Sequence, residues 1–170
     1  EMFRFFVLLK QRHPEYVMLI LTKDDPELVK REAAETGIDL QHLRVTYATR
    51  REVPLYMALS GCSIFFIRNT FSKMASSPTK HAELMGMGIP VICNAIGDTG
   101  NIINNTKTGV ILNNFDMNSL QGAVENIMIL GKIDKAYIRE CAKSLFDLKT
   151  GSEKYLKLYK TISNVIEQIR

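Results

Sequence analysis

The sequence predicts an α/β fold of the doubly wound class, in which helices cover both faces of a parallel sheet. Short and almost wholly apolar runs such as VMLIL, SIFFI and PVIC alternate with segments of helical character. Strands this apolar are typical of parallel sheets, because helices bury both of their faces. The 170 residues, 46% hydrophobic and 24% charged, suit one globular domain with a proper core.

The apolar runs place the strands. The expected strands are Tyr16–Thr22, Leu43–Ala48, Ser63–Ile67, Pro90–Asn94 and Gly109–Asn113. No run is long enough to cross a bilayer.

Capping residues place the first helices. The first covers residues 2–12. The second begins with Asp25 as N-cap and Pro26 at the first helical position, and it ends at Gly37. A short third helix is expected within residues 50–60.

The central helix follows the strand Ser63–Ile67 and a polar loop that we expect to be flexible. Ser77 is its expected N-cap, Pro78 its first residue, and Gly88 its end. Three more helices are expected after it: from a cap at Asp116 to Gly131, over Lys135–Phe146, and over Ser152–Ile169.

Charge and cysteine content narrow the function classes. The net charge of +4 favours anionic partners, but no basic tract with aromatic residues indicates nucleic-acid binding. The three cysteines lie in apolar segments, as core residues of a protein from a reducing compartment do. We therefore expect a cytoplasmic protein whose partner is a phosphorylated ligand rather than nucleic acid.

The start of the central helix is the candidate site. In doubly wound sheets, ligands bind beyond the carboxyl ends of the strands, where helix N-termini present free amides and a positive dipole end. Hydroxyls of Ser77 and Thr79 and the charge of Lys80 suit a diphosphate, and Glu83, one turn on, suits a pair of ribose hydroxyls. An ordinary capped helix with a surface ion pair between Lys80 and Glu83 is the open alternative.

The stretch SSPTKHAELMGMGIPVICNAIGD resembles the signature of the group 1 family of retaining, nucleotide-sugar-dependent glycosyltransferases. These enzymes consist of two Rossmann-like domains, the GT-B fold. The matching residues are Ser77, Pro78, Lys80, Glu83, Gly88, Pro90, Val91 and Gly97. Together with flanking segments the resemblance covers most of the chain and corresponds to the C-terminal, donor-binding half.

The resemblance implies roles for individual residues. Glu83 binds the ribose, while Ser77, Thr79 and Lys80 hold the diphosphate of the nucleotide sugar. Ser76 and Ala75 belong to the loop that faces the donor sugar, and many family members carry a glutamate where this chain has Ala75. The resemblance also places Thr49, Arg50 and Arg51 near the base.

The resemblance also implies a reaction. The whole enzyme is expected to transfer a sugar to a glycan or lipid-linked acceptor, as in polysaccharide biosynthesis, with neither metal nor cofactor. We expect the first strand and an N-terminal acceptor domain to lie outside residues 1–170, so that this piece alone binds nucleotide without transferring sugar. A nucleotide-sugar epimerase and a non-catalytic nucleotide-binding module remain alternatives.

The last helix carries lysines beside an apolar stripe. The stripe consists of Tyr155, Leu158, Tyr159, Ile162, Val165, Ile166 and Ile169. Packing on the domain core or on the N-terminal domain is the expected role, and peripheral contact with the inner face of a membrane stays open.

Overall fold

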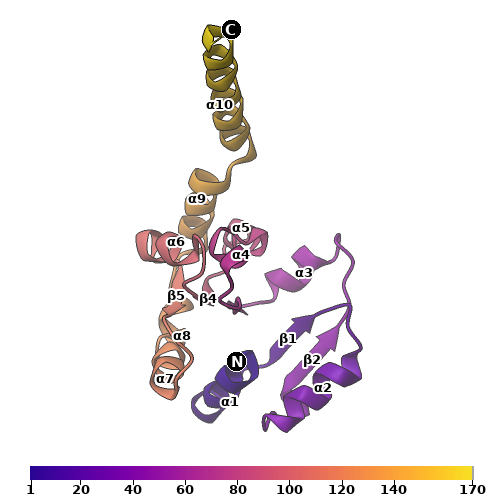
Figure 1. Ribbon diagram of the computed structural model, residues 1–170. Coiled ribbons are helices and arrows are strands. Elements are labelled where there is room, and N and C mark those ends of the chain that lie inside the picture. The colour runs from indigo at the N-terminus through magenta and orange to yellow at the C-terminus, as the bar shows by residue number, and fades with distance from the viewer. Residues whose placement is uncertain (170) are drawn as a thin grey trace.

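The computed structural model describes residues 1–169, with side chains described through Ser163. Parallel strands alternate with helices along the chain (Figure 1). The strands are β1 Met18–Leu21, β2 Leu43–Thr46, β3 Ser63–Phe65, β4 Val91–Asn94 and β5 Gly109–Leu112. The helices are α1 Met2–Arg12, α2 Pro26–Glu35, α3 Val53–Ala58, α4 Phe71–Met74, α5 Thr79–Gly86, α6 Thr99–Thr106, α7 Met117–Glu125, α8 Ile127–Leu130, α9 Lys135–Phe146 and α10 Leu148–Ile169, with a 3-10 turn at Leu40–His42.

All strand pairs are parallel, as predicted, but they form two sheets. One has the order β1-β2 and the other the order β3-β4-β5. Met18 lies opposite Leu43 in the first sheet, and Val91 lies opposite both Ser63 and Gly109 in the second. The chain therefore has the predicted class, parallel sheets flanked by helices, with a break in hydrogen bonding between β1 and β3.

One cluster of buried apolar residues contacts strands of both sheets. Phe5, Phe6 and Leu9 of α1 belong to one cluster of buried residues with Ile92 of β4 and Leu112 of β5. Partly buried side chains of β1 and of β3 pack against the same cluster. Side chains of both sheets therefore contribute to the same core.

A second, smaller cluster supports the site. Met85 of α5 packs with Ile138 and Ala142 of α9. Tyr137 of α9 also donates a hydrogen bond from its hydroxyl to the carbonyl of Thr106, over 2.9 Å. These contacts fix α5 against the body of the fold.

Two helical features differ from the expectation. The helix α6 was not predicted, because its asparagine-rich run NIINNT has low helix propensity, and burial of Ile103 stabilises it instead. The helix expected from Asp116 to Gly131 divides at Asn126 into α7 and α8. The side chain of Asn126 donates to the carbonyl of Gly122 over 2.8 Å and so competes with the helical backbone pattern.

The last helix begins earlier than predicted and extends away from the body (Figure 1). It begins at Leu148 rather than Ser152, because the Asp147 carboxylate accepts the amide of Thr150 over 2.8 Å. Large apolar side chains along it, including Tyr155 and Tyr159, are exposed. Val165, Ile166 and Ile169 of the predicted stripe lie outside the described side chains.

No helix within residues 1–169 combines the length and the apolar character needed to span a membrane.

Candidate functional site

The central helix begins one residue later than the capping pattern predicts. Pro78 has an extended ψ of 120° and stands at the N-cap position, so α5 begins at Thr79. The predicted roles of Ser77 as N-cap and Pro78 as first helical residue are therefore wrong. The carbonyl of Pro78, not that of Ser77, accepts an early helical bond, from the amide of His81 over 2.9 Å.

This start leaves amides free for a ligand. No side chain caps α5, and the amides of Thr79 and Lys80 have no acceptor among the described residues. Free amides at a helix N-terminus carry partial positive charge and bind anions. The ligand-facing part of the prediction thus has a geometric basis, although the capping residue differs.

The loop between β3 and α5 contains a helical turn that the sequence did not predict. The turn is α4, and Ser76 donates to the carbonyl of Lys73 through both its hydroxyl, over 2.8 Å, and its amide, over 3.2 Å. Ala75 ends this turn and is exposed. The two residues predicted to face the donor sugar therefore lie on a hydrogen-bonded turn directly before α5.

The loop after β4 lies against this turn. Gly97 has a φ of +58°, and a Cβ added there would stand 1.9 Å from the carbonyl oxygen of Ser76. Only a glycine allows the two loops to come this close. The sequence resemblance included Gly97, but the contact with Ser76 emerges only from the structure.

Two buried polar residues fix these loops, and the sequence prediction did not include them. The Asn94 amide accepts the N–H of Ile67 and donates to its carbonyl, each over 2.8 Å. The Thr99 hydroxyl donates to the carbonyl of Asn94 over 2.7 Å and accepts the amide of Ile96 over 3.0 Å. An asparagine ending an otherwise apolar strand was the available signal, since a buried amide needs partners.

A second helix start lies at the same edge of the sheet. Because β3 and β4 are parallel neighbours, their carboxyl ends share an edge, and α5 and α6 follow them there. Asp98 precedes α6 without capping it through its side chain. The site therefore combines two helix N-termini around the Ser76–Gly97 contact.

The polar side chains of α5 are available to a ligand. Thr79, Lys80 and Glu83 are all exposed, and Ser77 before them is exposed as well. The Lys80 ammonium lies 5.6 Å from the ring centroid of Phe65, at the end of β3. Among the described residues, Lys80 and Glu83 form no ion pair with one another or with any other side chain.

His81 lies on the opposite, buried side of α5. It is 0% exposed, and its ring centroid lies 5.7 Å from that of Phe65 and 6.3 Å from that of Phe146. Neither ring nitrogen has a hydrogen-bond partner in the part of the chain that is described. A structural role, as predicted, fits this apolar setting better than a role as catalytic base.

We expect the pH dependence of stability to report on His81. Burial lowers the pKa of its imidazole below the ordinary 6.5. The unfolded chain therefore takes up this proton more readily, so stability is complete above pH 6.5 and falls as the pH decreases below it. We expect the free energy of unfolding, measured in urea, to fall by about 1 kcal/mol between pH 7 and pH 5.

His81→Leu should abolish most of that loss, while the control His42→Leu should retain it. An equal pH dependence in both variants would contradict the assignment.

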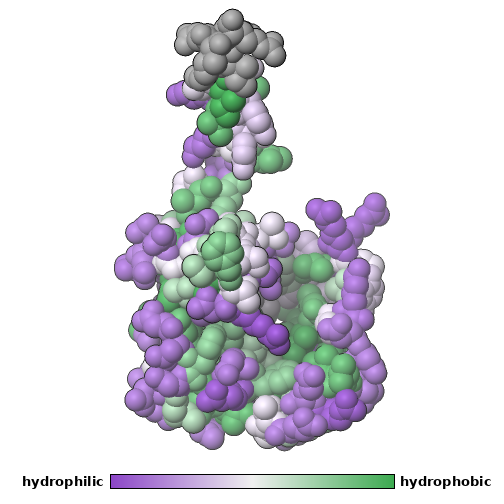
Figure 2. Space-filling view, viewed as in Figure 1, coloured by the Kyte–Doolittle hydropathy of each residue, from purple (hydrophilic) through white to green (hydrophobic). Residues whose placement is uncertain are grey.

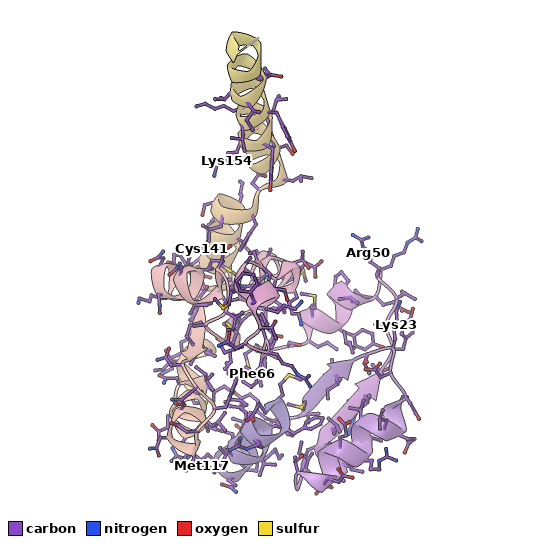
Figure 3. All side chains as sticks on the ribbon, in the orientation of Figure 1. Lys23, Arg50, Phe66, Met117, Cys141 and Lys154 are labelled. Atoms are coloured by element: carbon purple, nitrogen blue, oxygen red, sulfur yellow. The ribbon has the colours of Figure 1, made fainter. Side chains whose placement is uncertain are left out.

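The predicted base-proximal residues lie apart from α5. Thr49 donates its amide and hydroxyl to the carboxylate of Glu52, over 2.8 and 2.7 Å, at the start of α3. Arg50 and Arg51 are exposed, and Figure 3 shows Arg50 pointing outward beyond α3. The structure thus brings Ser76, Ser77, Thr79, Lys80 and Glu83 together but does not bring these three residues to them.

Comparison with known protein families shows which family this chain belongs to. The sequence model of the family described as glycosyl transferases group 1 matches residues 1–144. The chain belongs to this family. No curated protein sequence matches the chain in a direct comparison.

Solved structures support the same fold for this group 1 chain. Sucrose-phosphate synthase from Thermosynechococcus elongatus is similar at a TM-score of 0.68 and 18% identity, over 96% of this chain and 42% of that one. AviGT4, a glycosyltransferase involved in avilamycin A biosynthesis, is similar at a TM-score of 0.58 and 14% identity, over 94% and 46%. The chain thus spans less than half the length of these proteins, and the likeness concerns the GT-B fold alone.

Among the side chains that the structure describes, those of residues 1–163, no three or more His, Cys, Asp or Glu residues cluster in a way that could hold a metal ion.

Proposed function

We propose that residues 1–170 form the donor-binding half of a glycosyltransferase and bind a nucleotide diphosphate sugar at the start of α5. The observation that carries the proposal is the uncapped N-terminus of α5 with its two free amides. Membership in the group 1 family supports it. The side chains of Lys80 and Glu83, exposed and without ion-pair partners, supply the remaining recognition chemistry.

The diphosphate lies at the amides of Thr79 and Lys80. The Lys80 ammonium adds a point charge, and the hydroxyls of Ser77 and Thr79 add hydrogen bonds. As the bond between sugar and diphosphate breaks, the leaving group gains negative charge, which these groups stabilise. Such a mechanism is electrostatic and needs neither metal nor cofactor. We propose a retaining enzyme because the sequence resembles the retaining group 1 family.

The ribose lies one turn further along α5. Glu83 has two acceptor oxygens, which match two neighbouring hydroxyls. A carboxylate next to the phosphates would repel them, but the separation of one helical turn reduces that repulsion. The donor sugar lies beside the turn that holds Ala75 and Ser76.

The rest of the proposed reaction takes place with a second domain. In the whole enzyme, an N-terminal domain carries the acceptor, a glycan or lipid-linked glycan of polysaccharide biosynthesis, at a cytoplasmic site near the membrane. Thr49, Arg50 and Arg51 approach the base only if their loop moves toward α5. With Ala75 where many relatives carry a glutamate, the sugar must be recognised through other groups.

Calorimetric titration tests the site. UDP and GDP are compared with uridine and guanosine, on the unchanged chain and on Lys80→Ala and Glu83→Gln. Lys80→Ala should lower the affinity for the nucleoside diphosphates about 10- to 100-fold and change the affinity for the nucleosides little. The reason is that charge-assisted hydrogen bonds contribute about 1.5–3 kcal/mol. Glu83→Gln should lower the affinities for the nucleoside diphosphates and for the nucleosides to a similar extent.

Two surface variants serve as matched controls. Lys132→Ala and Glu140→Gln change exposed residues of the same types outside the site and should leave all affinities unchanged. Equal affinities in the site variants and these controls would contradict the assignment of the nucleotide site to the start of α5. With the whole protein, transfer of sugar to an added acceptor supports a transferase, whereas epimerised free nucleotide sugar or binding without turnover contradicts it.

A further inference from the structure

Phe65 lies beside both the ligand-facing and the buried side of α5. It ends β3 and is 4% exposed. The ammonium of Lys80 stands over its ring, 5.6 Å from the centroid, and the imidazole of His81 has its centroid 5.7 Å from the same point. On the face of the body where α4 and α5 lie, polar residues, coloured purple in Figure 2, stand next to apolar ones, coloured green. One aromatic ring is thus shared by two successive residues of α5, the first exposed and the second buried.

An aliphatic side chain would fill the same space in the core. The cluster of buried residues around Phe65 otherwise consists of aliphatic side chains and one thiol, namely Leu84, Ile89, Val91, Cys93 and Ile103. What an aromatic ring adds is the partial negative charge of its face, which attracts a cation within about 6 Å. The distance between the Lys80 ammonium and the Phe65 ring lies inside that range.

The ring holds the lysine without neutralising it. Within the part of the chain that the structure describes, Lys80 forms no ion pair with a carboxylate. An ammonium over an aromatic ring keeps its positive charge, and its N–H groups can still donate to phosphate oxygens. A carboxylate partner would instead cancel the charge, and an incoming phosphate would have to displace it.

The place at which the lysine is held suits a phosphate. Phe65 stands at the carboxyl end of β3, the edge at which ligands bind in folds of this class. The free amides of Thr79 and Lys80 lie at the start of α5, which follows β3 at that edge. An unheld lysine side chain has many rotamers, and ordering it on a ligand costs conformational entropy. A lysine already held over Phe65 loses less of this freedom on binding.

The neighbouring histidine does not compete for the ring as a second cation. His81 lies beside both Phe65 and Phe146, and burial lowers the pKa of its imidazole below the ordinary 6.5. The imidazole is therefore neutral at pH 7 and above. It packs on the Phe65 ring without repelling the Lys80 ammonium.

We propose that Phe65 is a positioning residue of the nucleotide site, whose ring holds the charged Lys80 ammonium at the carboxyl end of β3, where a phosphate of the ligand accepts from it. This inference rests on the proposed function, because it takes Lys80 to bind the diphosphate. Phe65 is buried and acts through Lys80 rather than on the ligand. The same ring also packs in the core, so the test has to distinguish positioning from packing.

A double-mutant cycle makes this distinction. UDP and uridine are titrated calorimetrically at pH 8 into the unchanged chain, Phe65→Leu, Lys80→Ala and the double variant. Phe65→Leu should lower the affinity for UDP about 3- to 10-fold and the affinity for uridine less than about 2-fold, because the cation–π contact orders only the group that binds phosphate. In the Lys80→Ala background, Phe65→Leu should change the affinity for UDP less than about 2-fold, since the ammonium is no longer there.

Two further variants complete the cycle. Phe66→Leu is the matched control, because Phe66 packs against the other core cluster with its ring 4.9 Å from that of Phe115. It should lower the stability measured in urea but leave the affinity for UDP unchanged. Phe65→Tyr keeps an aromatic face and should keep most of the affinity for UDP.

NMR spectroscopy detects the contact without any ligand. The ring current of Phe65 should shift the ε-methylene protons of Lys80 upfield from those of Lys132, an exposed lysine outside the site. Phe65→Leu should remove this shift, and Phe66→Leu should preserve it.

The outcomes distinguish this inference from the proposed function. An unshifted Lys80 resonance overturns the positioning role, as do equal losses of UDP affinity from Phe65→Leu with and without Lys80, and in both cases the nucleotide site itself stands. If the unchanged chain shows the shifted resonance but binds no UDP, the proposed function is wrong, and the positioning role is wrong with it.

Discussion

Gly97→Ala should lower the free energy of unfolding by about 2 to 5 kcal/mol. The left-handed backbone, with a φ of +58°, costs an alanine about 1–2 kcal/mol. The added Cβ would also stand 1.9 Å from the carbonyl oxygen of Ser76, and relieving such overpacking costs about 1–3 kcal/mol more. Urea unfolding of the variant and the unchanged chain measures the difference.

Gly97→Ala should also weaken the binding of UDP. Relieving the clash between the new Cβ and the Ser76 carbonyl displaces Ser76 and the turn before α5. Gly37→Ala is the matched control. Gly37 has a φ of +89°, but a Cβ there would meet no atom within 4 Å, so only the backbone cost of about 1–2 kcal/mol remains. If the two variants were equally stable and bound UDP equally well, the contact with Ser76 would have no role in the site.

The sequence predicted the local elements well because each rests on local chemistry. Apolar runs located all five strands, and the pair Asp25-Pro26 located the start of α2 through the bond from the Glu27 amide to Asp25. The strands are shorter than predicted, since hydrogen bonding ends before the apolar run does: β3 ends at Phe65 rather than Ile67. Such boundaries depend on the neighbouring strand, which the run itself does not specify.

Features that depend on distant residues escaped prediction. The helix α6 consists of weak helix formers and is stable only through packing on β4 and β5, where Ile103 is buried. The contact between Gly97 and Ser76 joins two loops that are distant in sequence. The division of the described strands into two sheets likewise depends on which strands pair in the folded chain. By contrast, the proximity of Thr79, Lys80 and Glu83 could be predicted, because helical spacing alone brings these side chains together.

The prediction that Ser77 is the N-cap of the central helix was wrong for a physical reason. A serine followed by proline is a frequent helix start, but Pro78 here keeps an extended ψ of 120° and remains outside the helix. The error does not remove the site, because the predicted anion binding depends on free amides rather than on which residue precedes them.

Asn94→Asp should lower the free energy of unfolding by about 2 to 6 kcal/mol at pH 7. The change preserves size but replaces the donor to the Ile67 carbonyl by an oxygen, so that two acceptors face each other across 2.8 Å. Asn94 is only 7% exposed, so the new charge is also poorly solvated. The lost hydrogen bond to the Ile67 carbonyl and the poorly solvated charge each cost about 1–3 kcal/mol. Urea unfolding measures the loss.

The pH dependence separates these causes from a general disturbance. Burial and the facing carbonyl favour the protonated carboxyl, which can again donate to Ile67, so the pKa of the introduced group lies above its unfolded value. The deficit should therefore shrink as the pH falls toward 4 and grow as it rises through that folded pKa. Asn113→Asp, at an exposed residue directly after β5, should change stability by less than about 0.5 kcal/mol at any of these values. A deficit in Asn94→Asp that does not vary with pH would mean that the amide bridge to Ile67 is not what holds the end of β3, and with it the entry to the turn before α5.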